Sequence, residues 1–191
     1  MKTMAMKSPV VLTFMAVLIF MLLPVMANAA DYKKVQADSS ITFVSRQMGV
    51  SAEGVFKKFT AQVKINLAKP EAGMAHIEID LASIDTGSVE ANDEVKGKSW
   101  FNVAEFPRAK FISSSVESLG AGKFVATGEM TIKGKVMEVR APFTLKEEKG
   151  VLQILGEFSL KRLDFGIGSG LWSDTSVVAD EVKIKFNLVL K

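Results

Sequence analysis

Apolar and polar residues alternate along most of the chain after residue 40. Strict alternation is typical of a β-strand that buries one face and exposes the other to water. The runs that show this pattern span residues 40–46, 59–65, 75–81, 108–119, 124–132, 136–147, 152–160 and 182–190. The pattern therefore predicts an all-β protein with about eight strands.

Gly and Pro mark the turns between these runs, at residues 70–73, 120–122, 133–135 and 148–150. Short connections of this kind join neighbouring antiparallel strands. Two longer connections interrupt the series, at 87–106 and 164–180. Within the first connection, the sequence predicts one short helix at 88–98, with residues 92–94 exposed.

Strands with one apolar face need that face covered, either by a second sheet or by closure of the sheet into a barrel. Long strands in meander order favour the second solution, an extended eight-stranded antiparallel β-barrel in a single domain. Such a barrel encloses either a packed core or room for one small ligand. Glycines interrupt the apolar faces and are interpreted as empty volume inside the barrel or as bends in its wall; they are Gly54, Gly128, Gly156 and Gly166.

The first 29 residues differ in character from the rest of the chain. Lys2 and Lys7 precede an apolar run at 10–23, and small residues flank Asn28, which is the layout of a cleavable signal peptide. The run is shorter than the about 20 residues that span a bilayer, although an uncleaved anchor is the alternative. We expect export and a mature domain at 30–191, whose net charge is +1 instead of the +3 of the whole chain. So small a charge argues against binding to nucleic acid.

The composition excludes several kinds of catalytic or metal site. The chain has no Cys, and its one His, His76, falls on the polar side of a predicted strand. Asp80 with Asp85, and Asp164 with Asp174, are the remaining pairs for hydrolytic chemistry, but Asp85 and Asp164 equally suit turn caps. We therefore predict no catalytic residue, no metal site and no cofactor, and we expect that the protein is not an enzyme.

An ordered set of short segments carries a resemblance to a known family. The segments are SITF at 40–43, MGV at 48–50, GVF at 54–56, IDTG at 84–87, ND at 92–93, WFNVAEFP at 100–107, AKF at 109–111, GEMTIKG at 128–134, RLDFGI at 162–167 and DEV at 180–182. Together they cover nearly all of the predicted mature chain. The set resembles the YceI-like proteins, a family of exported bacterial polyisoprenoid-binding proteins.

The resemblance implies a lipocalin-like extended barrel with a long apolar tunnel. It implies that the protein binds, transports or stores a polyisoprenoid lipid, such as an isoprenoid quinone or its precursor, or a long acyl chain, without chemical turnover. It also implies a location in the Gram-negative periplasm. Expected partners are the lipid itself, a second copy of the chain in a homodimer, and, transiently, the membrane or a redox membrane protein.

Alternation and resemblance together indicate which residues face the ligand. The predicted tunnel-wall residues are Phe43, Phe56, Phe59, Phe111, Met130, Phe143, Phe158, Phe165, Trp172 and Phe186. Arg46, Gln47 and Asp85 are the polar candidates for contact with the head group at the tunnel mouth. Gln47 stands where many members of the family have His, so its contact with a head group would not depend on pH. The alternative for Gln47 is that it satisfies backbone groups at the end of a strand.

Two other functional classes stay open beside the lipid carrier. One is a stress-related structural barrel with a filled core that acts by contacting other proteins. The other is a hydrolase that uses a carboxylate pair.

Overall fold

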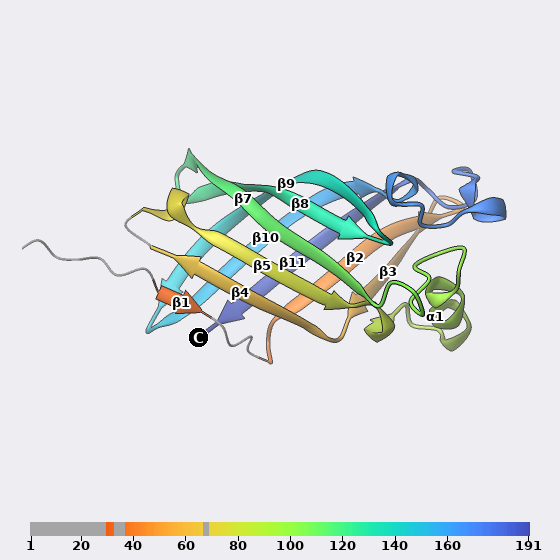
Figure 1. Ribbon diagram of the computed structural model, residues 1–191, viewed down its shortest axis with the longest axis horizontal. Helices are drawn as coiled ribbons and strands as arrows, with labels where there is room; N and C mark the ends of the chain where they lie inside the picture. The colour runs from red at the N-terminus through yellow and green to blue at the C-terminus, as the bar shows by residue number, and fades with distance from the viewer. Residues whose placement is uncertain (1–29, 33–36, 67–68) are drawn as a thin grey trace, which may run out of the picture.

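We describe a computed structural model of the chain, which covers residues 30–32, 37–66 and 69–191 (Figure 1). The predicted signal peptide at 1–29 lies outside the described residues. One antiparallel sheet contains all the strands of the described part, which are β1 (Ala30–Tyr32), β2 (Ser40–Gln47), β3 (Val50–Phe56), β4 (Phe59–Ile65), β5 (Met74–Asp80), β6 (Ile84–Asp85), β7 (Arg108–Gly120), β8 (Lys123–Ile132), β9 (Lys135–Glu148), β10 (Val151–Lys161) and β11 (Glu181–Leu190).

The strands follow the order β1-β4-β5-β7-β8-β9-β10-β11-β2-β3-β6 across the sheet. The sheet curls into an elongated barrel, and the long strands run obliquely along it (Figure 1). The chain passes directly from β3 to β4 through Lys57 and Lys58, across the seam between the two edges of the sheet. The Lys57 N–H donates to the Ser83 carbonyl at 3.1 Å, and the Asp80 N–H donates to the Lys58 carbonyl at 3.0 Å. This corner ties the two edges together at one point.

The predicted all-β antiparallel barrel with one short helix is confirmed. Each of the eight predicted runs contains a strand, and the predicted helix is α1 (Val89–Lys96), with Ser88 accepting from the Ala91 N–H at its N-terminus. The number of strands was underestimated, since β3 and the two short edge strands were missed. In β3, the inward positions between Val50 and Phe56 hold the small residues Ala52 and Gly54, so its apolar face is too weak to detect.

The buried faces follow the predicted alternation. Along β4, Ala61, Val63 and Ile65 are buried, whereas Gln62 and Lys64 between them are exposed. The opposite faces of the long strands carry the charged residues. The apolar faces thus point into the barrel, where they form one continuous core.

The interpretation of the inward glycines as empty volume was wrong at Gly54 and Gly156. Phe43 is the cross-strand partner of Gly54, and Phe186 is the partner of Gly156. In both pairs the phenyl ring lies over the glycine, so that an added Cβ would collide with it. The volume that the glycine lacks is therefore filled by the aromatic ring of the neighbouring strand.

One end of the barrel carries the irregular segments. Helix α1, the turn between β2 and β3, and the connection from β10 to β11 gather at this end, whereas the C-terminus lies at the other (Figure 1). That connection contains two 3-10 helices, η3 (Arg162–Phe165) and η4 (Gly170–Ser173). In the described part of the chain, no helix has the length and apolar character to span a membrane.

Candidate ligand-binding site

A cavity of about 570 Å³ occupies the end of the barrel that α1 and the β10–β11 connection cover. Ligand-binding cavities in proteins commonly have volumes of about 300–1,000 Å³. Most of its lining is apolar. The apolar lining residues are Ile41, Phe43, Ala52, Phe56, Ile79, Leu81, Ile84, Ala91, Val95, Trp100, Phe101, Ala109, Met130, Ile132, Leu160, Ile167, Trp172, Val178, Val182 and Ile184. The volume suits a molecule the size of a lipid segment.

A second, smaller cavity of about 100 Å³ lies farther along the barrel, toward the turn between β4 and β5 at Gly73 and Met74. It shares Ile41, Ile79, Met130 and Ile184 with the first cavity. These four residues form the boundary between the two cavities, so a long apolar molecule in the main cavity would point toward the second. The interior is thus neither uniformly filled nor fully open.

Most predicted wall residues line one of the two cavities. Phe43, Phe56 and Trp172 line the main cavity, and Met130 lines both. The second cavity is lined by the remaining four, which are Phe111, Phe143, Phe158 and Phe186. Eight of the ten predicted side chains thus lie beside internal space.

Phe59 and Phe165 lie outside the lining of both cavities. Phe165 is 2% exposed and belongs to the packed core beneath η3. Phe59 begins β4, directly after the corner between the sheet edges, and packs against the same core. The structure does not bring these two side chains to the cavities.

Of the three predicted head-group contacts, Gln47 is the one that lines the main cavity. Phe43, Ser45 and Gln47 alternate along the inner face of β2, and the backbone of Gln47 bridges Val178 of the β10–β11 connection. Arg46 points the other way and borders a shallow outer depression together with Lys183. Because successive side chains of a strand point to opposite faces, Arg46 points away from the cavity that Gln47 lines.

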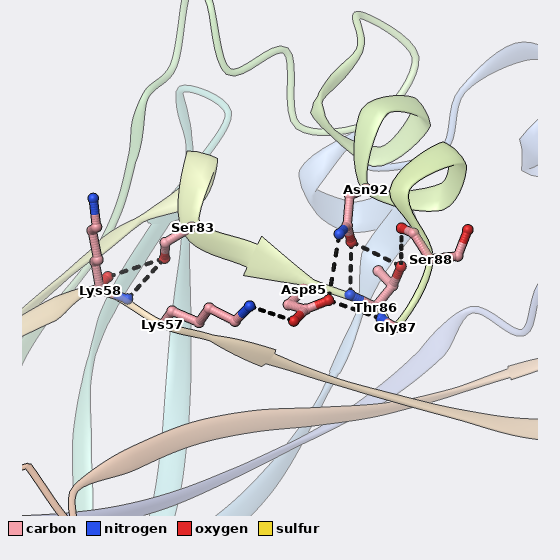
Figure 2. Close-up of polar contacts among 8 residues, drawn as sticks. All are labelled: Lys57, Lys58, Ser83, Asp85, Thr86, Gly87, Ser88 and Asn92. Atoms are coloured by element: carbon pink, nitrogen blue, oxygen red, sulfur yellow. Dashed lines mark hydrogen bonds and ion pairs between the residues drawn. The ribbon is translucent and has the colours of Figure 1, made fainter.

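Asp85 does not line the cavities either, because its carboxylate holds the start of α1 in place (Figure 2). It forms an ion pair with Lys57 and accepts from the Gly87 N–H at 3.0 Å and from the Asn92 amide at 3.4 Å. Asn92 in turn accepts from the Thr86 N–H at 2.7 Å. The Lys57 ammonium, then the Gly87 and Asn92 donors, lower the pKa of Asp85 to about 2.

Sequence reasoning missed Arg162, which organises the connection over the cavity. The side chain is 1% exposed, and its five N–H groups donate to five backbone carbonyls, those of Ile167, Gly168, Trp172, Val178 and Ala179, at 2.7–3.1 Å. Its guanidinium also lies 5.6 Å from the centre of the Trp100 ring. The signal was an isolated Arg at the end of an apolar strand, before a Gly-rich segment.

The two tryptophans of the chain join the covering segments to each other. The Trp172 indole N–H donates to the Glu94 carboxylate of α1 at 2.8 Å, and the two indole rings are 5.4 Å apart. Trp100 also lines the cavity, and its own indole N–H is buried with no hydrogen-bond partner among the described residues. The indole nitrogen of Trp100 is therefore enclosed by the packing of these segments, although its ring faces the cavity.

The carboxylates Asp80 and Asp174, which were considered for hydrolysis, accept hydrogen bonds from neighbouring residues. Asp80 accepts from the Ala82 N–H at 3.0 Å, and Asp174 accepts from the Ser176 N–H at 2.8 Å and from its hydroxyl. The Ser176 donors also lower the pKa of Asp174. The bond from the Gly87 N–H to Asp85 agrees with the turn-cap alternative for that residue.

His76 lies on the outer face of β5, where its Nε2 is 3.4 Å from Glu78 Oε1. Across the described ranges, no group of three or more His, Cys, Asp or Glu residues is arranged to hold a metal ion. The distinguishing feature of this site is therefore its apolar volume.

Comparison with protein families and curated relatives agrees with the resemblance seen in the sequence. The model of the YceI-like domain matches residues 32–190. UPF0312 proteins of two Shewanella strains, W3-18-1 and MR-7, are 33% identical over 129 residues and 34% identical over 118 residues. These matches cover 66% and 60% of this chain, and 65% and 62% of the relatives. The chain therefore spans less than two thirds of the length of these curated relatives.

Three solved structures share the fold. Burkholderia cenocepacia BcnA is 45% identical, with a TM-score of 0.81 over 83% of this chain and 100% of BcnA. A polyisoprenoid binding domain from Saccharophagus degradans, implicated in plant cell wall breakdown, is 16% identical, with a TM-score of 0.68 over 86% and 99% of the two chains. A Campylobacter jejuni YceI protein is 19% identical, with a TM-score of 0.66 over 72% and 84%. The last two likenesses concern the fold.

Proposed function

Because this chain belongs to the YceI-like family, we propose that it binds a polyisoprenoid or similar long-chain lipid in the barrel and carries or stores it without chemical turnover. The observation that carries the proposal is the apolar cavity of about 570 Å³, which borders a second cavity farther along the barrel. An isoprenoid quinone, its precursor or a long acyl chain matches this shape, since each has one polar end and a long apolar tail.

The apolar walls supply the affinity in this proposal. Burial of apolar surface contributes roughly 25 cal/mol per Å² removed from water, whatever the orientation of the tail. Met130, at the boundary of the two cavities, has a flexible thioether side chain that adapts to tails of different shape. The fold shared with the polyisoprenoid binding domain from Saccharophagus degradans supports the same ligand class.

We further propose a periplasmic location, based on the signal peptide predicted at 1–29, and transient contact with a membrane. Four large apolar side chains at the cavity end of the barrel are exposed, and we call them the rim: Met48 (73%), Val50 (70%), Val89 (70%) and Leu171 (94%). Exposed apolar groups around a lipid cavity suit insertion among lipid head groups. A homodimer and a redox membrane protein as partner remain expectations from the family resemblance.

The alternative functions have less support. A structural barrel with a filled core does not account for the cavity volume. A hydrolase would need a pair of free carboxylates, whereas Asp80, Asp85 and Asp174 accept hydrogen bonds from nearby backbone N–H groups.

Intrinsic fluorescence provides a direct test, because both tryptophans line the cavity. We expect the polyprenol geranylgeraniol to change the fluorescence of Trp100 and Trp172 saturably. Ala91→Phe adds a ring to the cavity lining and should weaken binding about tenfold or more, whereas Ala82→Phe, an exposed position outside the lining, should leave it unchanged. Absence of a saturable change, together with no lipid mass in native mass spectrometry of protein from its own host, would refute lipid binding.

A further inference from the structure

Charged groups are distributed unevenly in the lining of the main cavity. Among the described residues of this lining, the acidic ones are Glu53, Glu90 and Glu94, and the basic one is Arg162. Glu53 pairs with Val44 in the ladder between β2 and β3, on the outer side of the strand from Phe43 and Ser45. The carboxylates that concern a ligand are therefore Glu90 and Glu94.

Glu90 and Glu94 lie on the side of α1 that covers the cavity. They are four residues apart, one helical turn, and Ala91 and Val95 beside them also line the cavity. Both carboxylates are exposed at the mouth. Neither pairs with a cation in the described structure: Glu90 accepts from the Ser88 hydroxyl at 2.7 Å, and Glu94 accepts from the Trp172 indole. Both negative charges therefore make the electrostatic potential at the cavity mouth more negative.

Arg162 has no free N–H group with which to bind an anion. Each of its five N–H groups already donates to a backbone carbonyl, and the side chain is 1% exposed. The nearby cation on α1, Lys96, is directed to Asp93, at 3.8 Å, and is not part of the lining. A phosphate or carboxylate entering the mouth would thus meet two carboxylates and no available cation.

A donor for an uncharged polar group is present instead. The Gln47 amide lines the cavity and is exposed, whereas the Trp100 indole nitrogen is enclosed and has no partner among the described residues. A carbonyl or hydroxyl oxygen can accept from the Gln47 amide without a counter-ion. The lining therefore offers hydrogen bonds to a neutral head and repulsion to an anionic one.

We infer that this cavity selects lipids whose head group is uncharged or cationic and disfavours anionic head groups such as phosphate or carboxylate. The inference rests on the proposed function, since it requires that the tail occupies the cavity. Glu90 and Glu94 are the specificity-determining residues. Two charges at several ångströms in a partly solvated mouth correspond to a difference in affinity on the order of tenfold.

The test compares three ligands with one tail: geranylgeraniol, geranylgeranylamine and geranylgeranyl phosphate. We expect the alcohol and the amine to bind wild-type protein at least about tenfold more tightly than the phosphate, as measured by the fluorescence of Trp100 and Trp172. The difference should shrink as NaCl is raised from about 0.05 to 0.5 M, because salt screens exposed charges. Equal affinities of the alcohol and the phosphate would overturn the inference while leaving lipid binding intact.

Neutral variants assign the effect to the two carboxylates. The double substitution Glu90→Gln with Glu94→Gln should bring phosphate affinity close to that of the alcohol, with little change for the alcohol itself. Glutamine at 94 keeps an oxygen that accepts from the Trp172 indole, so the contact between the covering segments is retained. Glu138→Gln is the matched control, because it removes an exposed carboxylate of β9 that lies outside the lining. It should leave the affinities for all three ligands unchanged. An unchanged preference in the double variant would overturn the assignment, and failure of all three ligands to bind would refute the proposed function itself.

Discussion

At the scale of single residues, Arg162 shows how one side chain can define a whole connection. Its five donors gather carbonyls from residues 167–179, a segment with little regular structure of its own. Burial lowers the pKa of Arg162, and the nearby Asp180 partly opposes this effect. Gly168 has φ +75° and lies directly against the guanidinium, where a Cβ would not fit. The Arg and the Gly therefore depend on each other.

Replacement of Arg162 by Met should destabilise the protein strongly. The substitution keeps much of the volume but leaves five buried or half-buried carbonyls without donors, which costs about 3 kcal/mol or more. Urea unfolding followed by circular dichroism measures the effect. The control is Lys161→Met, at the exposed neighbouring position, which should change stability by less than about 0.5 kcal/mol. Equal midpoints for the two variants would contradict the anchoring role.

At the scale of elements, α1 depends on the loop that precedes it more than on its own length. A helix of eight residues is too short to be stable alone. Asp85, Thr86 and Asn92 connect it to β6, and the Lys57–Asp85 ion pair connects β6 to the corner between β3 and β4 (Figure 2). The position of Glu90 and Glu94 at the cavity mouth follows from this attachment.

Asp85→Asn should lower stability in a pH-dependent way. The pKa of Asp85 is about 2 in the folded protein, whereas an unfolded Asp titrates near 3.9. The contribution of the carboxylate is therefore fully present above about pH 4 and is lost as the pH falls toward 2. We expect a lower urea midpoint for the variant at pH 7 and a difference from wild type that shrinks between pH 4 and pH 2.

Asp93→Asn is the control for this experiment. Asp93 lies on the same helix, its side chain is 75% exposed, and its ion pair with Lys96 is long, at 3.8 Å. The midpoint of this variant should stay near that of wild type at every pH. A pH-independent loss in Asp85→Asn would contradict the role of its charge.

At the scale of the whole molecule, the two ends of the barrel differ. The β7–β8 and β9–β10 hairpins and the C-terminus lie at one end, and α1 and the β10–β11 connection lie at the other (Figure 1). The main cavity and the rim belong to the second end. In the proposed function, a lipid that leaves a bilayer for the main cavity enters at the second end. The asymmetry makes the rim the surface on which transfer would depend.

Loss of the rim should slow transfer of lipid without changing the cavity. We expect Met48→Ser with Leu171→Ser to reduce the rate of geranylgeraniol uptake from phosphatidylcholine vesicles several-fold, because less apolar surface inserts between lipids. The affinity for geranylgeraniol free in solution should stay unchanged. Leu119→Ser, which removes an exposed apolar side chain at the opposite end, is the control. Equal uptake rates for the rim variant and this control would contradict membrane contact through the rim.

The sequence alone predicts the class of fold and the inner faces of most strands. The period of two is a local property, readable from each run separately, so Phe43 and Met130 could be assigned to the interior without knowing their neighbours. The ordered family segments identify the YceI-like architecture. By contrast, β3 was missed because the small residues Ala52 and Gly54 weaken its apolar face, although Gly54 is needed to admit the ring of Phe43 from β2.

Tertiary structure decides what lies between those faces. Whether an inward glycine leaves space depends on its partner in the ladder, which no local pattern reveals. The cavity combines segments that are far apart in the chain, as the contact between Trp172 and Glu94 illustrates. Local alternation can thus determine that the protein is a barrel with an apolar interior. The register and packing of distant segments determine where the main cavity lies and which charged side chains lie at its mouth.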